Sequence, residues 1–193
     1  MSQSAGRGLP REVRIIGGAW KRSKLPVGEG EGLRPTPDRV RETLFNWLGQ
    51  DLTGWRCLDA FAGSGTLGFE AASRGATEVL MLECDPQLVQ ALRASALRLK
   101  AQGLRVEQAD ALSWMKRETR TGFDLVFIDP PFDAGLFEPA LAASRGTLSE
   151  GGLVYLESPT AWTGEQLAPL GFHLLRQSRA GAVHFHLLQL GPR

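Results

Sequence analysis

A glycine-rich turn between an apolar strand and a helix constrains this chain more than any other feature. The strand ends at Asp59, and Gly63, Gly65 and Gly68 follow in the spacing G-x-G-x-x-G where a helix opens. Because glycine has no Cβ atom, Gly63 and Gly65 can adopt positive φ and let a ligand approach the backbone. Gly68 allows the helix to pack closely on the strand, and the helix N-terminus supplies free N–H groups. The pattern predicts a site for a nucleotide-type ligand.

The carboxylate of Asp59 narrows the class of nucleotide. It would repel a pyrophosphate placed over the helix N-terminus, whereas it would attract a cationic amino-acid group. S-adenosylmethionine carries such a group, with an ammonium and a sulfonium. Residues 59–68 also resemble the first motif of Rossmann-like methyltransferases, D-x-F-A-G-S-G-x-L-G. We therefore expect S-adenosylmethionine as cofactor; a tight strand–helix turn without a ligand is the alternative.

Strands and helices alternate beyond this turn. We expect strands at residues 78–83, 105–110, 123–128 and 153–157 with helices between them, and a hairpin formed by residues 172–179 and 183–190. This order predicts an α/β fold, a parallel sheet with helices on both faces that the last hairpin makes mixed.

Acidic residues end several of these strands and should face one crevice, where ligands of doubly wound sheets bind. Glu83 is placed to bind ribose hydroxyls, although this position would suit NAD equally well. Asp110 could meet an adenine amino group or could cap the next helix. The candidate cofactor-binding residues are Asp59, Phe61, Ala62, Gly63, Gly65, Thr66, Glu83, Cys84, Asp110 and Ala111.

The tetrapeptide Asp129-Pro130-Pro131-Phe132 follows the fourth predicted strand. An exocyclic amine of a nucleobase is a poor nucleophile, because its lone pair is delocalised into the ring. The Asp129 carboxylate and the Pro130 carbonyl could accept its N–H groups and favour the lone pair leaving the ring plane, while Phe132 stacks on the base. The tetrapeptide resembles the [DNS]-P-P-[FYW] motif of amino methyltransferases; a proline-rich turn is the alternative. Asp129, Pro130 and Phe132 are the candidate catalytic residues.

The first part of the chain is basic. Residues 1–41 contain nine Lys or Arg and four Asp or Glu, a net charge of +5, although the whole chain carries only +1. Aromatic and basic side chains interleave between Val13 and Leu25, a pattern that suits RNA but also a solvated β-hairpin. We expect a flexible basic extension at residues 1–33 and a methyltransferase domain at 34–193. The candidate RNA contacts are Arg14, Lys21, Arg22, Arg34 and Arg39.

Several features argue against other classes. Two cysteines, both in apolar strand segments, predict buried reduced thiols rather than a disulfide or metal site. His184 and His186 share one strand face, for which we expect solvent rather than metal. No apolar run reaches transmembrane length and no signal-peptide core is present, so we expect a cytoplasmic protein.

Thr36 is expected to be the N-cap of a helix that begins at Pro37 and stops at Gly49.

Longer stretches resemble the bacterial 16S rRNA guanine-N2 methyltransferase family (RsmD-like). They are residues 14–18, 33–36, 38–42, 44–48, 61–65, 129–132 and 155–158. The resemblance implies a seven-stranded class I methyltransferase sheet, S-adenosylmethionine as methyl donor and a guanine of 16S rRNA in the small ribosomal subunit or its assembly intermediate as target. We expect a monomer without metal or membrane contact. The alternatives are a DNA adenine-N6 methyltransferase, an NAD-type oxidoreductase and a non-catalytic RNA-binding module.

Overall fold

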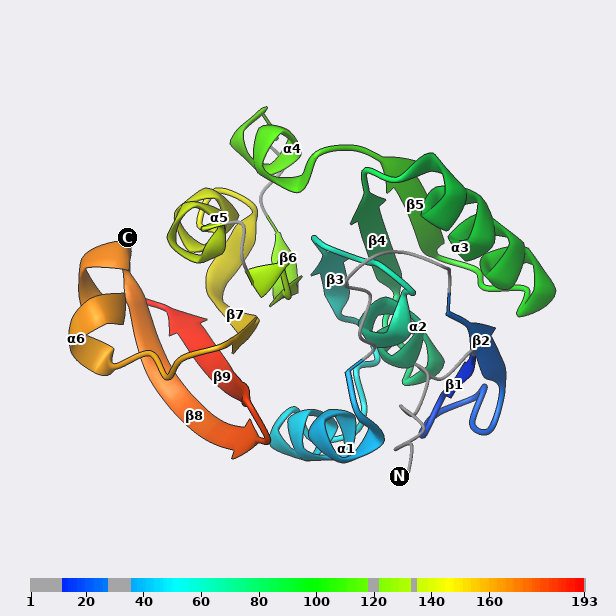
Figure 1. Ribbon diagram of the computed structural model, residues 1–193, viewed down its shortest axis with the longest axis horizontal. Helices are drawn as coiled ribbons and strands as arrows, with labels where there is room; N and C mark the ends of the chain where they lie inside the picture. The colour runs from blue at the N-terminus through cyan, green and yellow to red at the C-terminus, as the bar shows by residue number, and fades with distance from the viewer. Residues whose placement is uncertain (1–11, 28–35, 118–121, 133–134, 193) are drawn as a thin grey trace, which may run out of the picture.

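The computed structural model describes residues 12–27, 36–117, 122–132 and 135–192, which form an α/β sandwich around a mixed sheet (Figure 1). The sheet order is β5-β4-β3-β6-β7-β9-β8. The strands are β3 (Arg56–Asp59), β4 (Glu78–Glu83), β5 (Leu104–Gln108), β6 (Phe123–Ile128), β7 (Leu148–Ser158), β8 (Phe172–Ala180) and β9 (Val183–Leu190). Strands β3 to β7 are parallel, and β9 pairs antiparallel with both β7 and β8. The predicted seven-stranded mixed sheet with its antiparallel C-terminal hairpin is confirmed.

Helices cover both faces of this sheet. They are α1 (Asp38–Trp47), α2 (Thr66–Ser73), α3 (Pro86–Arg98), α4 (Ala111–Arg117), α5 (Phe137–Ser144) and the short α6 (Gly164–Leu167), which the 3₁₀ turn η2 (Ala168–Leu170) follows. Alternate residues of one strand enter different cores: Cys57 packs with α1, α2 and α3, whereas Leu58 packs with α4 and α5. This alternation follows from the two-residue period of a strand, and it requires apolar residues on both faces of the parallel strands.

Local sequence signals explain most helix ends. Asp85 caps α3, because its Oδ1 accepts hydrogen bonds from the N–H groups of Gln87 and Leu88, and Pro86 occupies the first turn. Gly49 follows α1 with φ of 87°, a conformation that favours glycine at this place. The predicted cap Thr36 is wrong, since Pro37 is the N-cap residue and the buried Thr36 directs its side chain elsewhere.

The N-terminal segment is joined to the body through a buried acid. Strands β1 (Glu12–Arg14) and β2 (Lys24–Pro26) form a separate antiparallel pair. Glu70 on α2 accepts the backbone N–H groups of Ile16 and Gly17 and forms ion pairs with Arg41 and Arg74. Arg41 is fully buried and also donates to the carbonyl of Arg14. Its charge therefore serves this internal network, and the segment after β1 is part of the folded body.

Three further sequence expectations differ from the structure. His186 is fully buried rather than solvated, since the N–H of Trp162 donates to its Nε2. Cys84 is exposed because β4 ends at Glu83, while Cys57 is buried as expected. Strand β5 ends at Gln108, before Asp110. Among the described residues, no helix is long and apolar enough to cross a membrane.

Candidate active site

The sheet order places a topological switch between β3 and β6. From β3 the chain moves outward to β4 and β5, and then returns to the other side of β3 as β6. Ligands of such sheets bind outside the carboxyl ends of the strands at this point. Asp59 ends β3 and Asp129 follows β6, so the two acidic motifs found in the sequence lie on either side of the switch.

The glycine turn has the conformation that its sequence predicts. Gly63 and Gly65 have φ of 53° and 76°, and Gly65 is the N-cap residue of α2. A Cβ atom on Gly68 would lie 2.5 Å from Met81 Cε and 3.0 Å from Asp59 Oδ2. Glycine is therefore required there for α2 to approach the strands. The neighbouring turn residues Ala62 and Thr66 are buried, and Phe61 is half-buried.

Asp59 is a buried acid that holds the start of α2. Its Oδ2 accepts the N–H of Gly68 at 2.9 Å, and the residue is 3% exposed. Burial raises the pKa of Asp59 to about 7, and the charge of Glu83 acts in the same direction, whereas hydrogen bonds from Gly68 and Phe61 oppose the shift. A cation beside Asp59 would favour its ionised form, as the ammonium of an amino-acid ligand can do.

Glu83 connects the glycine turn to the residue that caps α3. One carboxylate oxygen accepts the N–H of Gly63 at 2.8 Å, and the other accepts the N–H of Asp85 at 2.9 Å. The first of these oxygens accepts no other hydrogen bond among the described residues, so it can still accept a ribose hydroxyl, whereas the second is also 3.5 Å from the Cys84 thiol. At the end of the next strand, Asp110 is exposed and its Oδ1 accepts the N–H of Ser113. Asp110 therefore caps α4, whose first residue, Ala111, is buried.

The tetrapeptide after β6 presents both polar and aromatic groups. Asp129 is half-buried and Pro130 is buried, whereas the ring of Phe132 is 37% exposed and lies 6.1 Å from the ring of Phe137. Loss of hydration and the charges of Glu157 and Asp59 raise the pKa of Asp129 well above its usual value. The Asp129 carboxyl group and the Pro130 carbonyl could accept hydrogen bonds from a planar base, and the exposed ring of Phe132 could stack on it.

Sequence reasoning gave no role to Glu157, although it lies in the stretch 155–158. Glu157 is the penultimate residue of β7, next to Asp129, and is 4% exposed. Its carboxylate accepts a hydrogen bond from the Tyr155 hydroxyl at 2.8 Å and one from the side chain of Thr36. Burial raises the pKa of Glu157, and these two hydrogen bonds oppose the shift. The sequence signal that could have indicated a role for Glu157 is the presence of a charged residue in an otherwise apolar strand.

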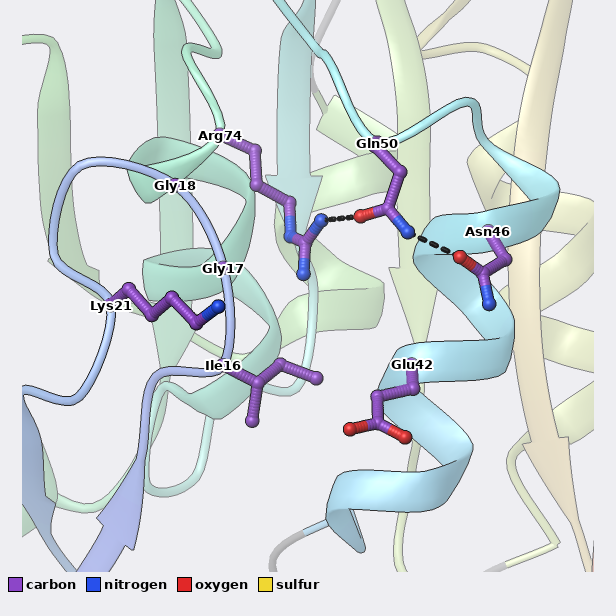
Figure 2. Close-up of a pocket in the computed structure, with 8 residues that line it drawn as sticks. All are labelled: Ile16, Gly17, Gly18, Lys21, Glu42, Asn46, Gln50 and Arg74. Carbon is purple, nitrogen blue, oxygen red and sulfur yellow. Dashed lines mark hydrogen bonds between the residues drawn. The ribbon is translucent and has the colours of Figure 1, made fainter.

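The candidate RNA contacts that the structure describes are exposed. Arg14, Lys21 and Arg22 belong to the N-terminal segment, and Arg39 lies in the first turn of α1. Arg34 lies outside the described residues. A pocket of about 460 Å³ lies between this segment and α1 (Figure 2), lined by Ile16, Gly17, Gly18, Lys21, Glu42, Asn46, Gln50 and Arg74.

This pocket is distinct from the glycine turn. Arg74 follows the C-terminus of α2, whereas the glycine turn precedes its N-terminus, so the helix separates them by about 12 Å. Within the described part of the chain, no group of three or more His, Cys, Asp or Glu side chains could hold a metal ion.

Comparisons with known proteins identify the family. Residues 13–189 match the model of the family described as conserved hypothetical protein 95. The ribosomal RNA small subunit methyltransferase D of Escherichia coli strain K12 is 43% identical over 92% of this chain and 90% of its own length. The protein of the same name from Haemophilus influenzae is 42% identical, covering 92% of this chain and 94% of its own.

A solved structure agrees with these sequence matches. The putative methyltransferase yhhF of Escherichia coli superposes with a TM-score of 0.83 at 42% identity, over 94% of this chain and 99% of the other. The fold, the order of the motifs and these matches lead to one conclusion. The chain belongs to the conserved hypothetical protein 95 family and is a class I, RsmD-like methyltransferase.

Proposed function

We propose that this protein transfers a methyl group from S-adenosylmethionine to the exocyclic N2 amine of a guanine in 16S rRNA, and that it acts on small-subunit particles. The observation that carries the proposal is the position of Asp129-Pro130-Pro131-Phe132 directly across the topological switch from the Asp59 turn. Two relatives that cover almost the whole chain are named as methyltransferases of small-subunit ribosomal RNA.

The residues at the strand ends fit the proposed cofactor. The turn at Gly63 and Gly65 would let S-adenosylmethionine approach the protein backbone. Asp59 would offset the ammonium charge of the cofactor, and Glu83 would accept hydrogen bonds from its ribose hydroxyls. Asp110 would stay close to the adenine while it caps α4. S-adenosylmethionine supplies an electrophilic methyl group carried on a sulfonium sulfur.

The protein's own residues would prepare the amine. The Asp129 carboxylate and the Pro130 carbonyl accept the two N–H groups, and Phe132 stacks on a guanine that has left its helix. These contacts fix the direction of the amine lone pair, which is the main requirement for an in-line displacement. The methylated nitrogen is strongly acidic, so it can release its proton to Asp129 without a strong base.

A methyl-transfer assay tests this proposal. We would incubate the protein with labelled S-adenosylmethionine and one of three substrates: small subunits from unmodified cells, naked 16S rRNA, or duplex DNA. We expect label as N2-methylguanine in the small subunit. Label as N6-methyladenine in DNA would transfer the assignment to the alternative enzyme class, and cofactor binding without any transfer would favour a binding module.

The basic N-terminal segment would contact RNA phosphates, and substitution tests this role better than deletion. Ile15 and Leu25 are buried in the core and Glu70 needs the N–H groups of the segment, so a deletion would disturb the fold. The triple variant R14A/K21A/R22A should weaken RNA binding and lower its salt dependence by up to about 2 to 3 in slope. The matched variant R176A/R179A removes exposed charges from the edge strand β8 and should change neither.

A further inference from the structure

Three acidic residues lie on one face of the sheet, at the carboxyl ends of β3, β6 and β7. Phe127 and Tyr155 pack in the core shared with α1 and α2, whereas Ile128 and Leu156 pack on the opposite face. The parallel register pairs Phe127 with Tyr155 and Ile128 with Leu156, so Asp129 and Glu157 come next as neighbours. By the two-residue alternation they face the same side as Tyr155. Asp59 shares that face, two residues after Cys57.

The two neighbouring acids have different hydrogen-bond partners. Glu157 receives one donor from the Tyr155 hydroxyl and one from Thr36, at the segment that leads into α1. For Asp129, no donor to its carboxylate occurs among the described residues, and Asp59 and Glu157 both add negative charge near it. Two carboxyl groups this close cannot both ionise without a large cost, so the pair retains one proton. The two donors favour ionised Glu157, which leaves the proton on Asp129.

We propose that Glu157 is a positioning residue that acts through Asp129: anchored by Tyr155 and Thr36, its carboxylate keeps the shared proton on Asp129 until a cationic ligand enters the site. This inference rests on the proposed function, in which Asp129 contacts the target amine. A cation that binds beside these carboxylates favours their ionised forms, so Asp129 becomes a full acceptor only in the loaded site.

The first test needs neither substrate nor turnover. The variant E157Q keeps an acceptor oxygen for Tyr155 but removes the charge, and the titration of the Asp129 carboxyl carbon is followed by ¹³C NMR. We expect the midpoint of Asp129 to fall by about one pH unit or more. The control E150Q makes the same change at the exposed, opposite end of β7 and should leave the midpoint unchanged.

A reciprocal variant protects the test against misfolding of E157Q. Glu157 ionises while Asp129 is still protonated, so the neutral variant D129N should leave the midpoint of Glu157 nearly unchanged, whereas E157Q lowers that of Asp129. A shift of the Asp129 midpoint below about half a unit in E157Q, or a fall of the Glu157 midpoint by about one unit in D129N, would overturn the proposal. These titrations are independent of the methyl-transfer reaction, so failure of the proposed function would not be mistaken for failure of the pairing.

Kinetics then separate a positioning role from a structural one. We expect the acidic limb of the kcat profile of E157Q to move to lower pH in parallel with the NMR midpoint. A kcat that falls equally at all pH values, with the limb in its wild-type place, would indicate that Glu157 serves only the fold and would overturn the proposal.

Discussion

Replacement of Asp59 by asparagine isolates the energetic effect of a buried acid at the glycine turn. The pKa of Asp59 is about 7 in the folded protein, whereas a free aspartate titrates at about 3.9. The folded state therefore holds this proton more tightly, and the stability that it contributes is fully present below about pH 4 and is lost as pH rises toward 7. Between about pH 5 and about pH 8, the free energy of unfolding falls by about 2.5 kcal/mol because of this titration. Asparagine keeps an acceptor for the Gly68 N–H and removes the titration.

Urea denaturation of both proteins at the two pH values measures this loss. The stability of D59N relative to wild type should rise by about 2.5 kcal/mol between about pH 5 and about pH 8, whatever its constant offset. Loss of the Asp59 charge also eases the ionisation of Asp129, which acts in the same direction. The control D51N alters an exposed acid whose pKa Thr53 lowers, so its relative stability should not change over this range. A pH-independent difference for D59N would refute the reasoning.

Two further substitutions test the base site and the internal ion network. F132A should lower kcat/KM for RNA by about tenfold or more, because base–aromatic stacking is worth about 1–3 kcal/mol. Thermal stability should not fall, since Phe132 is 37% exposed. Steady-state kinetics and a melting curve check these two expectations, and an unchanged kcat/KM would contradict the first. E70A leaves the buried guanidinium of Arg41 with only the exposed Asp38 as an ionic partner, and it should destabilise the protein by about 3–5 kcal/mol in urea. The exposed control E165A should cost less than about 0.5 kcal/mol, and equal effects of the two variants would contradict the role of the network.

Local patterns predicted most of the fold because they act over short distances. The glycine turn, the Asp85-Pro86 cap and the alternation of apolar strands with helices each depend on a few neighbouring residues, and the structure contains all of them. The carboxyl ends of parallel strands necessarily meet at one edge, so Asp59 and Asp129 could be brought together from sequence alone.

The expectations that were wrong depend on contacts between distant segments. Thr36 has the chemistry of a helix cap, but Glu157 lies more than a hundred residues later and takes its side chain. His186 is buried on β9, where it accepts a hydrogen bond from the N–H of Trp162, and no local pattern signals that bond. Arg41 belongs to the basic first part of the chain, yet it is fully buried and pairs with Glu70. Charge and polarity indicate where a side chain prefers to be, whereas tertiary packing decides which partner it finds.

Single-turnover methyl transfer by D129A tests the central claim most directly, because it separates the cofactor half of the site from the half that would hold the amine. If the strand ends on one side of the switch bind the cofactor and Asp129 prepares the amine, D129A should retain S-adenosylmethionine binding in calorimetry. Transfer to small subunits should then fall by about a hundredfold or more. Transfer at a rate comparable to wild type would contradict the account, since the amine would then need no acceptor at Asp129.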